Sequence, residues 1–298
     1  MDAVRSTVAA PREPDPGPGA PSRRALLRTA GLLALAPVAA CAGDAEPPRA
    51  AIPPRRLPSP RAHRALLPEA PDAKPTEPAP GPRTPAPAPP PPVRTAPFTR
   101  LPRAGHALAL TFDDGPDPRW TPEVLAVLAA HEVRATFFVC GRQAARHPAL
   151  LRRITEAGHL IGNHTWDHRR LTGLGRAAVE EQLARTSETV RRATGRAPAW
   201  FRAPYGEWDR TVYALGARHG MEPLAWNVDT EDWSRPGAAA ITRRALAGAS
   251  PGAVVLCHDG GGDRAQTVAA LRRLLPRLRA GGWDLVQPDR RLTRGGTA

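Results

Sequence analysis

The first hundred residues of this chain contain no tryptophan and no tyrosine, although 25 of its 37 prolines lie there. A segment rich in proline and poor in large apolar side chains cannot bury enough surface to fold by itself. All seven tryptophans and both tyrosines come after residue 100. We therefore expect one folded domain over residues 105–298 of the 298-residue chain, a length within the single-domain range.

Lysine is almost absent: of the 42 basic residues, Lys74 is the one lysine and the others are arginines. The net charge of +14 is spread along the chain: 14 basic and 8 acidic residues precede residue 101, and 28 basic and 20 acidic residues follow. An excess of basic over acidic residues can indicate nucleic acid, anionic lipid or an acidic polymer as a partner. No nucleic-acid-binding motif accompanies it, so we expect no nucleic-acid partner.

Cysteine is scarce as well, with three residues in all. Cys140 and Cys257 each end an apolar run, which is typical of cysteines that behave as small buried hydrophobic residues. The sequence does not say whether these two are close enough to form a disulfide.

The apolar run at residues 29–40 is too short to cross a bilayer as a helix, but it fits the h-region of an export signal. It follows Arg23 and Arg24 in the order S-R-R-x-L-L-R, which resembles a twin-arginine signal. The "VAAC" at its end resembles a lipobox, and on that resemblance Cys41 would be lipidated. The alternative is an ordinary basic signal that is cut beside an incidental cysteine. We expect residues 1–41 to form a twin-arginine-like lipoprotein signal, with Cys41 as the first residue of the mature protein.

Residues 42–104 include "PAPAPPPPV" and similar stretches. Such a composition favours extended polyproline II, so we expect a disordered linker that holds the domain away from a membrane. A partner-binding proline tract is the alternative. The expected location is the outer face of the cell membrane, as a lipoprotein, or outside the cell as a secreted protein.

Apolar runs of strand length alternate with segments of helical period after residue 105. This alternation predicts a mostly parallel sheet covered by helices, and about seven strands favour a distorted (β/α) barrel. The expected strands are 106–112, 134–140, 159–164, 199–206, 222–229, 252–259 and 283–287; the expected helices are 120–133, 146–158, 175–195, 209–220, 238–248 and 264–282, with a kink at Pro276.

Polar residues follow five of the expected strands. In parallel α/β folds the chemistry gathers at the carboxyl ends of the strands, so these residues are expected to share one site. They are Asp113 and Asp114 in the first case, then "HTWDH" (164–168), "RAPYG" (202–206), "DTEDW" (229–233) and "CHDG" (257–260).

His164 and His168 are four residues apart, and one helical turn would place both imidazoles on the same side. Two histidines so arranged can chelate a divalent ion, although surface pairs with this spacing are common. A carboxylate from another strand end would complete the two-histidine, one-carboxylate set of an open catalytic site.

The five motifs "TFDDGP", "HTWDH", "RAPYG", "DTEDW" and "LCH" resemble, in order and spacing, those of the polysaccharide deacetylase family (NodB homology, carbohydrate esterase family 4). The resemblance covers about residues 105–287. It implies a distorted (β/α) barrel that hydrolyses acetyl groups on N-acetylated or O-acetylated sugars with one divalent metal.

The resemblance also implies a role for each motif residue. Asp114, His164 and His168 would bind the metal, zinc in the first place and cobalt as the alternative. Asp113 would be the general base, because a carboxylate suffices to take a proton from a metal-activated water.

The remaining roles come from the later motifs. Arg202 would hold Asp113 in its ionised form through a charge-assisted hydrogen bond. The Tyr205 backbone N–H would meet the oxyanion, and His258 would protonate the leaving group with the help of Asp232. Trp233 and Leu256 would line the slot for the acetyl methyl group.

Other polar residues are expected to be structural. Asp229 is interpreted as closing a turn, and "DGGGD" (259–263) as a flexible rim of the site, because no Lys-Ser or Lys-Thr follows it as a phosphate loop would require.

The prediction is a monomeric, metal-dependent deacetylase of an extracellular polysaccharide, with peptidoglycan amino sugars favoured because a membrane-tethered protein meets the cell wall first. Chitooligosaccharides and acetylxylan are the alternative substrates. A wall-glycan-binding lipoprotein without catalysis, or a surface lipoprotein whose stalk is the functional part, are the alternatives from other classes.

Overall fold

The computed structural model describes residues 90–293. The predicted signal (1–41), the lipidation site Cys41 and most of the predicted linker lie outside the described residues. Among the described helices none is both long enough and apolar enough to cross a membrane.

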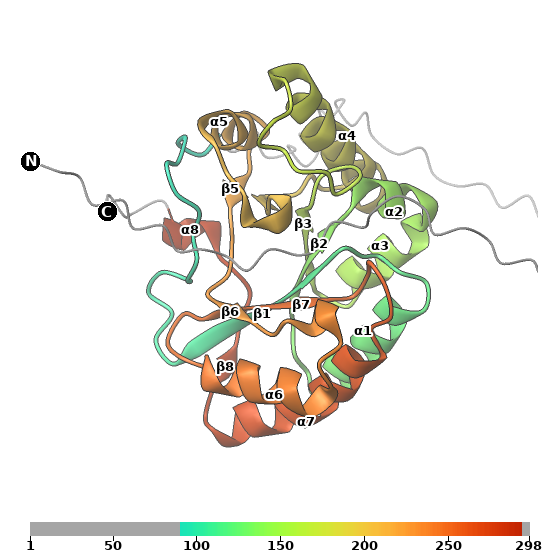
Figure 1. Cartoon of the computed structure of the whole chain (residues 1–298), viewed down its shortest axis with the longest axis vertical. Coiled ribbons are helices and arrows are strands. Elements are labelled where there is room, and N and C mark those ends of the chain that lie inside the picture. Colours follow the sequence, from blue (N-terminus) through green and yellow to red (C-terminus); the bar gives the residue numbers. More distant parts are fainter. Residues whose placement is uncertain (1–89, 294–298) are drawn as a thin grey trace, which may run out of the picture. The chain divides into compact units, whose positions relative to one another are not determined.

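Strands and helices alternate in this part of the chain, as the sequence predicts (Figure 1). The strands are β1 (Ala107–Asp113), β2 (Thr136–Val139), β3 (Leu160–Asn163), β4 (Trp200–Phe201), β5 (Glu222–Pro223), β6 (Val228–Asp229), β7 (Val254–His258) and β8 (Asp284–Leu285). The helices are α1 (Trp120–Ala130), α2 (Gly141–Arg146), α3 (Pro148–Glu156), α4 (Arg176–Thr194), α5 (Arg210–Arg218), α6 (Ala238–Ala247), α7 (Ala265–Ala280) and α8 (Arg290–Thr293), with short 3-10 turns η1 (Pro204–Gly206) and η2 (Asp232–Ser234).

All eight strands belong to one parallel sheet in the order β5-β4-β3-β2-β1-β7-β6, with β8 pairing to β1. Strands β5 and β6 lie at opposite ends of this order, yet only residues 224–227 separate them in the chain. A connection this short requires the two ends of the sheet to lie near each other. The sheet is therefore strongly curled, and the predicted distorted (β/α) barrel is confirmed.

The prediction of a single strand over 222–229 was wrong. The chain pairs with β4 at Glu222–Pro223, leaves the sheet, and pairs with β7 at Val228–Asp229. Between these strands the carbonyls of Leu224 and Ala225 accept hydrogen bonds from the Arg202 guanidinium at 3.0 and 2.9 Å. The buried Arg202 guanidinium thus donates the hydrogen bonds that a neighbouring strand would otherwise donate to these two carbonyls.

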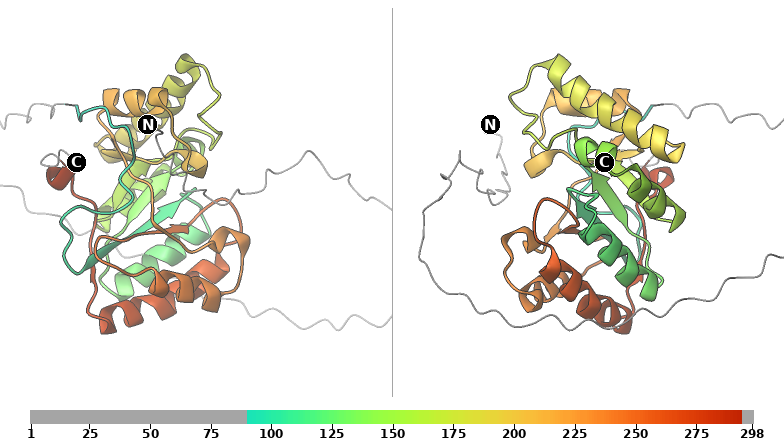
Figure 2. Two further views of the ribbon diagram at one scale, coloured as in Figure 1. Left: turned by 60° about the vertical axis from the view of Figure 1, so that its left-hand side comes forward. Right: turned by 90° about the vertical axis from the view of Figure 1, so that its right-hand side faces the viewer.

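Helices pack around the outside of the curved sheet in an arc. α6 packs on α7, α7 on α1, α1 on α3, α3 on α4, and α4 on α5. Figures 1 and 2 show the two ends of this arc, with α6 and α7 at one side of the sheet and α4 and α5 at the other. Helix α7 continues through Pro276 without interruption.

Alternation along the strands separates two apolar layers. On β1, Leu108, Leu110 and Phe112 belong to the main core shared with the helices. Ala109 belongs to a smaller cluster with Phe138 and other inward-facing residues. The last residue of β1, Asp113, has the parity of Ala109 and so faces the interior of the barrel.

The domain begins before residue 105. Phe98 forms a parallel bridge with Leu224, and Arg100 forms an antiparallel bridge with Ala253. Leu101 is buried in the inner cluster. Residues 98–101, which composition alone placed at the end of the linker, therefore pack against the barrel.

Candidate active site

The end of β1 brings two neighbouring carboxylates to the same place. Asp113 is the last strand residue and lies in register with His258 on β7. Asp114 has a φ of 73°, in the left-handed region, which breaks the alternation of the strand. Asp113 Oδ2 and Asp114 Oδ1 consequently lie at the same distance, 3.6 Å, from His164 Nε2.

The two histidines of "HTWDH" meet through a loop and not through a helix, so the predicted helical turn was wrong. The segment after β3 has no helical residues, and Thr165 and His168 adopt φ values of 66° and 60°. Asn163 Oδ1 accepts the Thr165 N–H, and Thr165 Oγ1 accepts the His168 N–H, which fixes this loop. The imidazole centroids of His164 and His168 lie 4.9 Å apart.

Asp114, His164 and His168 form a group that could hold a metal ion. One ligand atom from each lies within 4.8 Å of the other two, and Asp114 Oδ1 is 3.3 Å from His168 Nε2. Asp114 Oδ1 is buried and has no hydrogen-bond partner among the described residues. A buried carboxylate oxygen without a donor, facing two imidazole nitrogens, fits a divalent cation.

The protonation states of His164 and Asp114 also suit a divalent cation. The Arg202 carbonyl lies 2.8 Å from His164 Nδ1, and because a carbonyl can only accept, the proton is on Nδ1 and the Nε2 lone pair faces the site. Burial lowers the pKa of His164, which keeps its imidazole neutral as metal binding requires. Burial opposes ionisation of Asp114, but the neighbouring His168 and His258 outweigh it and lower its pKa.

Arg202 is fully buried and binds Asp113, the other of the two neighbouring carboxylates. Its Nη1 donates to Asp113 Oδ1 at 2.7 Å and to Thr111 Oγ1 at 3.0 Å. Its guanidinium also lies over the Phe138 ring, 4.1 Å from the centroid. Because Oδ1 of Asp113 is held in this way, Oδ2 remains directed toward His164 and the candidate metal group.

His258 and Asp232 form a second buried pair. Asp232 Oδ1 lies 2.7 Å from His258 Nδ1, and Asp232 Oδ2 accepts from the His258 N–H and from Thr267 Oγ1. Burial opposes the imidazolium, but the Asp232 charge and hydrogen bond raise the pKa of His258 to about 10. His258 is therefore a cation at neutral pH, with its Nε2 proton available as an acid.

Replacing Asp232 by asparagine should lower the pKa of His258 from about 10 toward its ordinary 6.5, because the largest favourable charge is lost. A raised folded-state pKa stabilises the fold below the unfolded value, and this contribution disappears as the pH rises through the folded value. The pair should thus stabilise the protein at neutral pH and below, and lose its effect near pH 10.

This change can be measured on the metal-free protein by an NMR titration of the His258 ring, together with thermal unfolding at neutral pH and above pH 10. Asp284→Asn, which alters an exposed carboxylate on β8, is the matched control. An unchanged His258 titration in Asp232→Asn would contradict the assigned pairing.

The remaining predicted site residues lie around these groups. Leu256 is two residues before His258 on β7, so both side chains face the barrel interior, and Trp233 follows Asp232 in η2. Tyr205, in η1, has a φ of 62°, and its ring meets the His168 ring edge-on with centroids 4.9 Å apart. Their predicted roles toward the substrate stay predictions.

The structure also describes Asp229 and the two cysteines. Asp229 Oδ1 accepts the Glu231 N–H, as expected of a residue that closes a turn, and burial raises the pKa of Asp229. Cys140 and Cys257 are buried free thiols, and burial raises the pKa of both well above the usual range.

Sequence reasoning missed a buried acid beside the site. Asp259, which follows His258, is fully buried and accepts a 2.5 Å hydrogen bond from Thr121 Oγ1. Burial and the charges of Asp114 and Asp113 raise its pKa to about 7, although the Thr121 hydrogen bond opposes them. Local sequence carries no signal for this pair, because its two residues are 138 positions apart.

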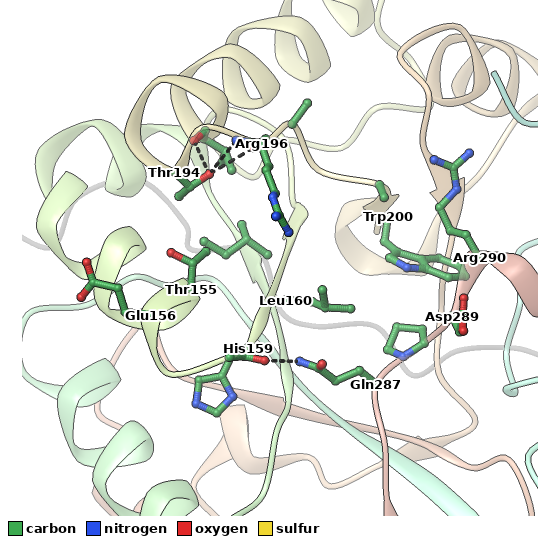
Figure 3. Close-up of a pocket in the computed structure, with 16 residues that line it drawn as sticks. Thr155, Glu156, His159, Leu160, Thr194, Arg196, Trp200, Gln287, Asp289 and Arg290 are labelled. Carbon is green, nitrogen blue, oxygen red and sulfur yellow. Dashed lines mark hydrogen bonds between the residues drawn. The ribbon is translucent and has the colours of Figure 1, made fainter. Parts of the chain in front are cut away.

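A separate hollow lies at the other end of the strands (Figure 3). Leu160 and Trp200, the first residues of β3 and β4, line it together with residues 287–290. None of the predicted site residues lines it, so it is distinct from the polar cluster at the carboxyl ends.

Comparison with known proteins identifies relatives of this chain. A family profile described as polysaccharide deacetylase matches residues 101–224. A chitooligosaccharide deacetylase of Sinorhizobium fredii is 44% identical over 197 residues, which cover 61% of this chain and 92% of that protein. The peptidoglycan-N-acetylglucosamine deacetylase PgdA of Listeria monocytogenes is 41% identical over 182 residues, which cover 61% of this chain and 38% of that protein.

A solved structure has the same fold. The crystal structure of the Bc1960 peptidoglycan N-acetylglucosamine deacetylase superposes with a TM-score of 0.61 at 36% identity. The match covers 63% of this chain and 88% of that one. At 36% identity the two proteins are similar in the sequence of the domain as well as in its fold.

Proposed function

Because the chain belongs to the polysaccharide deacetylase family, we propose that it is a metal-dependent hydrolase that removes N-acetyl groups from the amino sugars of peptidoglycan. The observation that carries the metal dependence is the unpartnered, buried Asp114 Oδ1 that faces His164 and His168. Zinc is the proposed ion and cobalt the alternative, since two imidazoles and a carboxylate suit either. When bound there, the ion supplies Lewis acidity toward the acetyl carbonyl and the attacking water.

Asp113 is the proposed base. Its Oδ1 is fixed by Arg202, and its Oδ2 points to the candidate metal group, where it would take the proton from the attacking water. The oxygen of that water adds to the acetyl carbon, and the C–N bond to the sugar breaks.

His258 is the proposed acid. Its Nδ1 is held by Asp232, so the Nε2 proton is the one that can pass to the leaving nitrogen, giving the free amine and acetate. Because Asp113 and His258 are in register on neighbouring strands, the two proton transfers take place within one narrow site. Leu256 and Trp233 are proposed to line the acetyl slot, and the Tyr205 N–H to meet the developing oxyanion.

Peptidoglycan is preferred over chitooligosaccharides for a reason that lies outside the described residues. The twin-arginine-like signal and the lipobox-like "VAAC" would place the domain, held by a lipid anchor, outside the membrane and beside the cell wall. We propose separately that the protein is a monomer. The relatives are named for chitooligosaccharide and for peptidoglycan deacetylation, and both substrates are amino-sugar polymers. Acetylxylan, an O-acetylated polymer, is the third candidate.

Acetate release from peptidoglycan, chitooligosaccharides and acetylxylan, measured on the same protein, tests this proposal. Fastest release from peptidoglycan is expected. Faster release from acetylxylan would overturn the assignment to amino sugars. Binding of glycan without acetate release from any of the three would favour the non-catalytic alternative.

Removal of the divalent metal should abolish acetate release, and added Zn²⁺ or Co²⁺ should restore it. His164→Ala should behave like the metal-free protein and bind neither ion tightly, because one of three protein ligands is lost. His219→Ala is the control, since His219 contacts Glu180 on α4 and takes no part in the site. Full activity after complete metal removal would contradict the proposed mechanism.

A further inference from the structure

A closed circuit of hydrogen bonds surrounds the turn that carries the two carboxylates. At the start of the turn, the Asp113 carbonyl accepts the Asp259 N–H at 3.1 Å. At its end, Thr121 Oγ1 accepts the Asp117 N–H at 2.8 Å. Thr121 Oγ1 then donates to Asp259 Oδ2 at 2.5 Å and closes the circuit. Both ends of the turn are thus tied to the same two residues, the start through the Asp259 backbone N–H and the end through the Thr121 hydroxyl.

Close packing of the segment after β7 fixes the middle of the turn. A methyl group at Gly115 would lie 2.4 Å from both Asp259 carboxylate oxygens. A methyl group at Gly260 would lie 2.3 Å from the Asp114 carbonyl, and one at Gly261 would lie 2.5 Å from Asp114 Oδ2. The glycine run that the sequence suggested as a flexible rim therefore packs directly against the candidate metal-binding aspartate.

Neither member of this pair can touch a substrate. The side chains of Thr121 and Asp259 are fully buried. Among the described residues, Thr121 is the one side chain that donates to the Asp259 carboxylate, and Asp259 Oδ1 has no partner. Burying a carboxylate with a single donor is costly, so its presence here calls for an explanation other than stability.

We propose that Thr121 and Asp259 are positioning residues, which hold the Asp113–Asp117 turn so that Asp114 faces the metal while Asp113 faces the attacking water. This inference rests on the proposed function and adds two residues that act through Asp113 and Asp114. Side chains that orient metal ligands commonly change metal affinity by about 10- to 100-fold when they are replaced.

Thr121→Val removes the hydroxyl and keeps the size of the side chain. We expect the affinity for Zn²⁺, measured by competition with a chelator, to fall by about 10- to 100-fold. Thr121→Ser, which keeps the hydroxyl, should restore the affinity. Thr242→Val is the matched control, since it removes a buried hydroxyl on α6 that donates to the Ala238 carbonyl, and it should leave the affinity unchanged.

Asp259→Ala tests the other side of the same hydrogen bond and serves if Thr121→Val does not fold. Because either single variant already removes the Thr121–Asp259 hydrogen bond, the double variant should lose less affinity than the sum of the two single losses. Zn²⁺ affinities equal to that of the unaltered protein in the folded Thr121→Val and Asp259→Ala variants would overturn the inference. Additive losses in the double variant would also overturn it.

Failure of this inference can be told apart from failure of the proposed function, since the metal affinity is measured without substrate. A protein that binds Zn²⁺ tightly but releases no acetate would contradict the deacetylase activity and leave the positioning role intact. Unchanged Zn²⁺ affinity in the variants, with acetate release preserved in the unaltered protein, would contradict the positioning role alone.

Discussion

Asp113→Asn should reduce acetate release by about 10²- to 10⁴-fold, the range expected when a general base is lost. The asparagine can still accept from Arg202 Nη1 through its amide oxygen, so the fold and the metal site should persist. The loss should therefore appear in kcat per folded molecule, with the bound metal content close to that of the unaltered protein. The midpoint of thermal unfolding should fall, because the buried Arg202 loses its ionised partner.

The matched control is Asp263→Asn. Asp263 is an exposed carboxylate in the segment between β7 and α7, where its Oδ1 accepts the Ala265 N–H. Its replacement should leave acetate release nearly unchanged. Full activity in Asp113→Asn would show that the proton is taken by another group, and Asp113 would then be left with a structural role as the partner of Arg202.

Arg202→Met should have the largest effect on stability. The arginine side chain is fully buried, and its loss leaves the buried Asp113 carboxylate without its cation and two carbonyls without their donor. Removing one partner of a buried ion pair commonly costs about 3–5 kcal/mol of the free energy of unfolding. That is a large part of the roughly 5–15 kcal/mol available to a domain. Chemical denaturation of both proteins measures it.

Two further variants identify the origin of that loss. Arg202→Lys keeps a positive charge but cannot reproduce the planar fork that reaches Asp113, Leu224 and Ala225, so it should recover only part of the stability. Adding Asp113→Asn to Arg202→Met should also recover part of it, because no buried carboxylate is then left unpaired.

Arg94→Met is the control for a general loss of an arginine. Arg94 forms an ion pair with the buried Glu222 near the edge of the barrel, through Nε and Nη2 at 3.0 Å. This variant should be less stable than the unaltered protein but should keep its acetate release per folded molecule. Equal stability of Arg202→Met and the unaltered protein would contradict the view that Arg202 holds the barrel interior together.

Periodicity was sufficient to predict most of the barrel. Apolar runs bounded by turn residues mark β1, β2, β3 and β7, and amphipathic segments mark the longer helices, because burial of one face leaves a repeating trace in the sequence. The division of 222–229 into β5 and β6 could not be predicted in this way. It depends on hydrogen bonds from Arg202, more than twenty residues away.

The features of the site also fall into those that the sequence predicts and those that only the tertiary structure determines. The sequence alone predicts which residues meet at the site. Parallel strands bring their carboxyl ends to one side of the barrel, and each motif lies at such an end. The geometry came from elsewhere: the left-handed backbone at Asp114, the loop that joins His164 to His168, and the buried Thr121–Asp259 contact. Such contacts join residues far apart in the chain, so only the tertiary structure decides them. The sequence determines which carboxylates and imidazoles are present, and the fold determines which of them faces a metal, which faces a cation, and which holds the others in place.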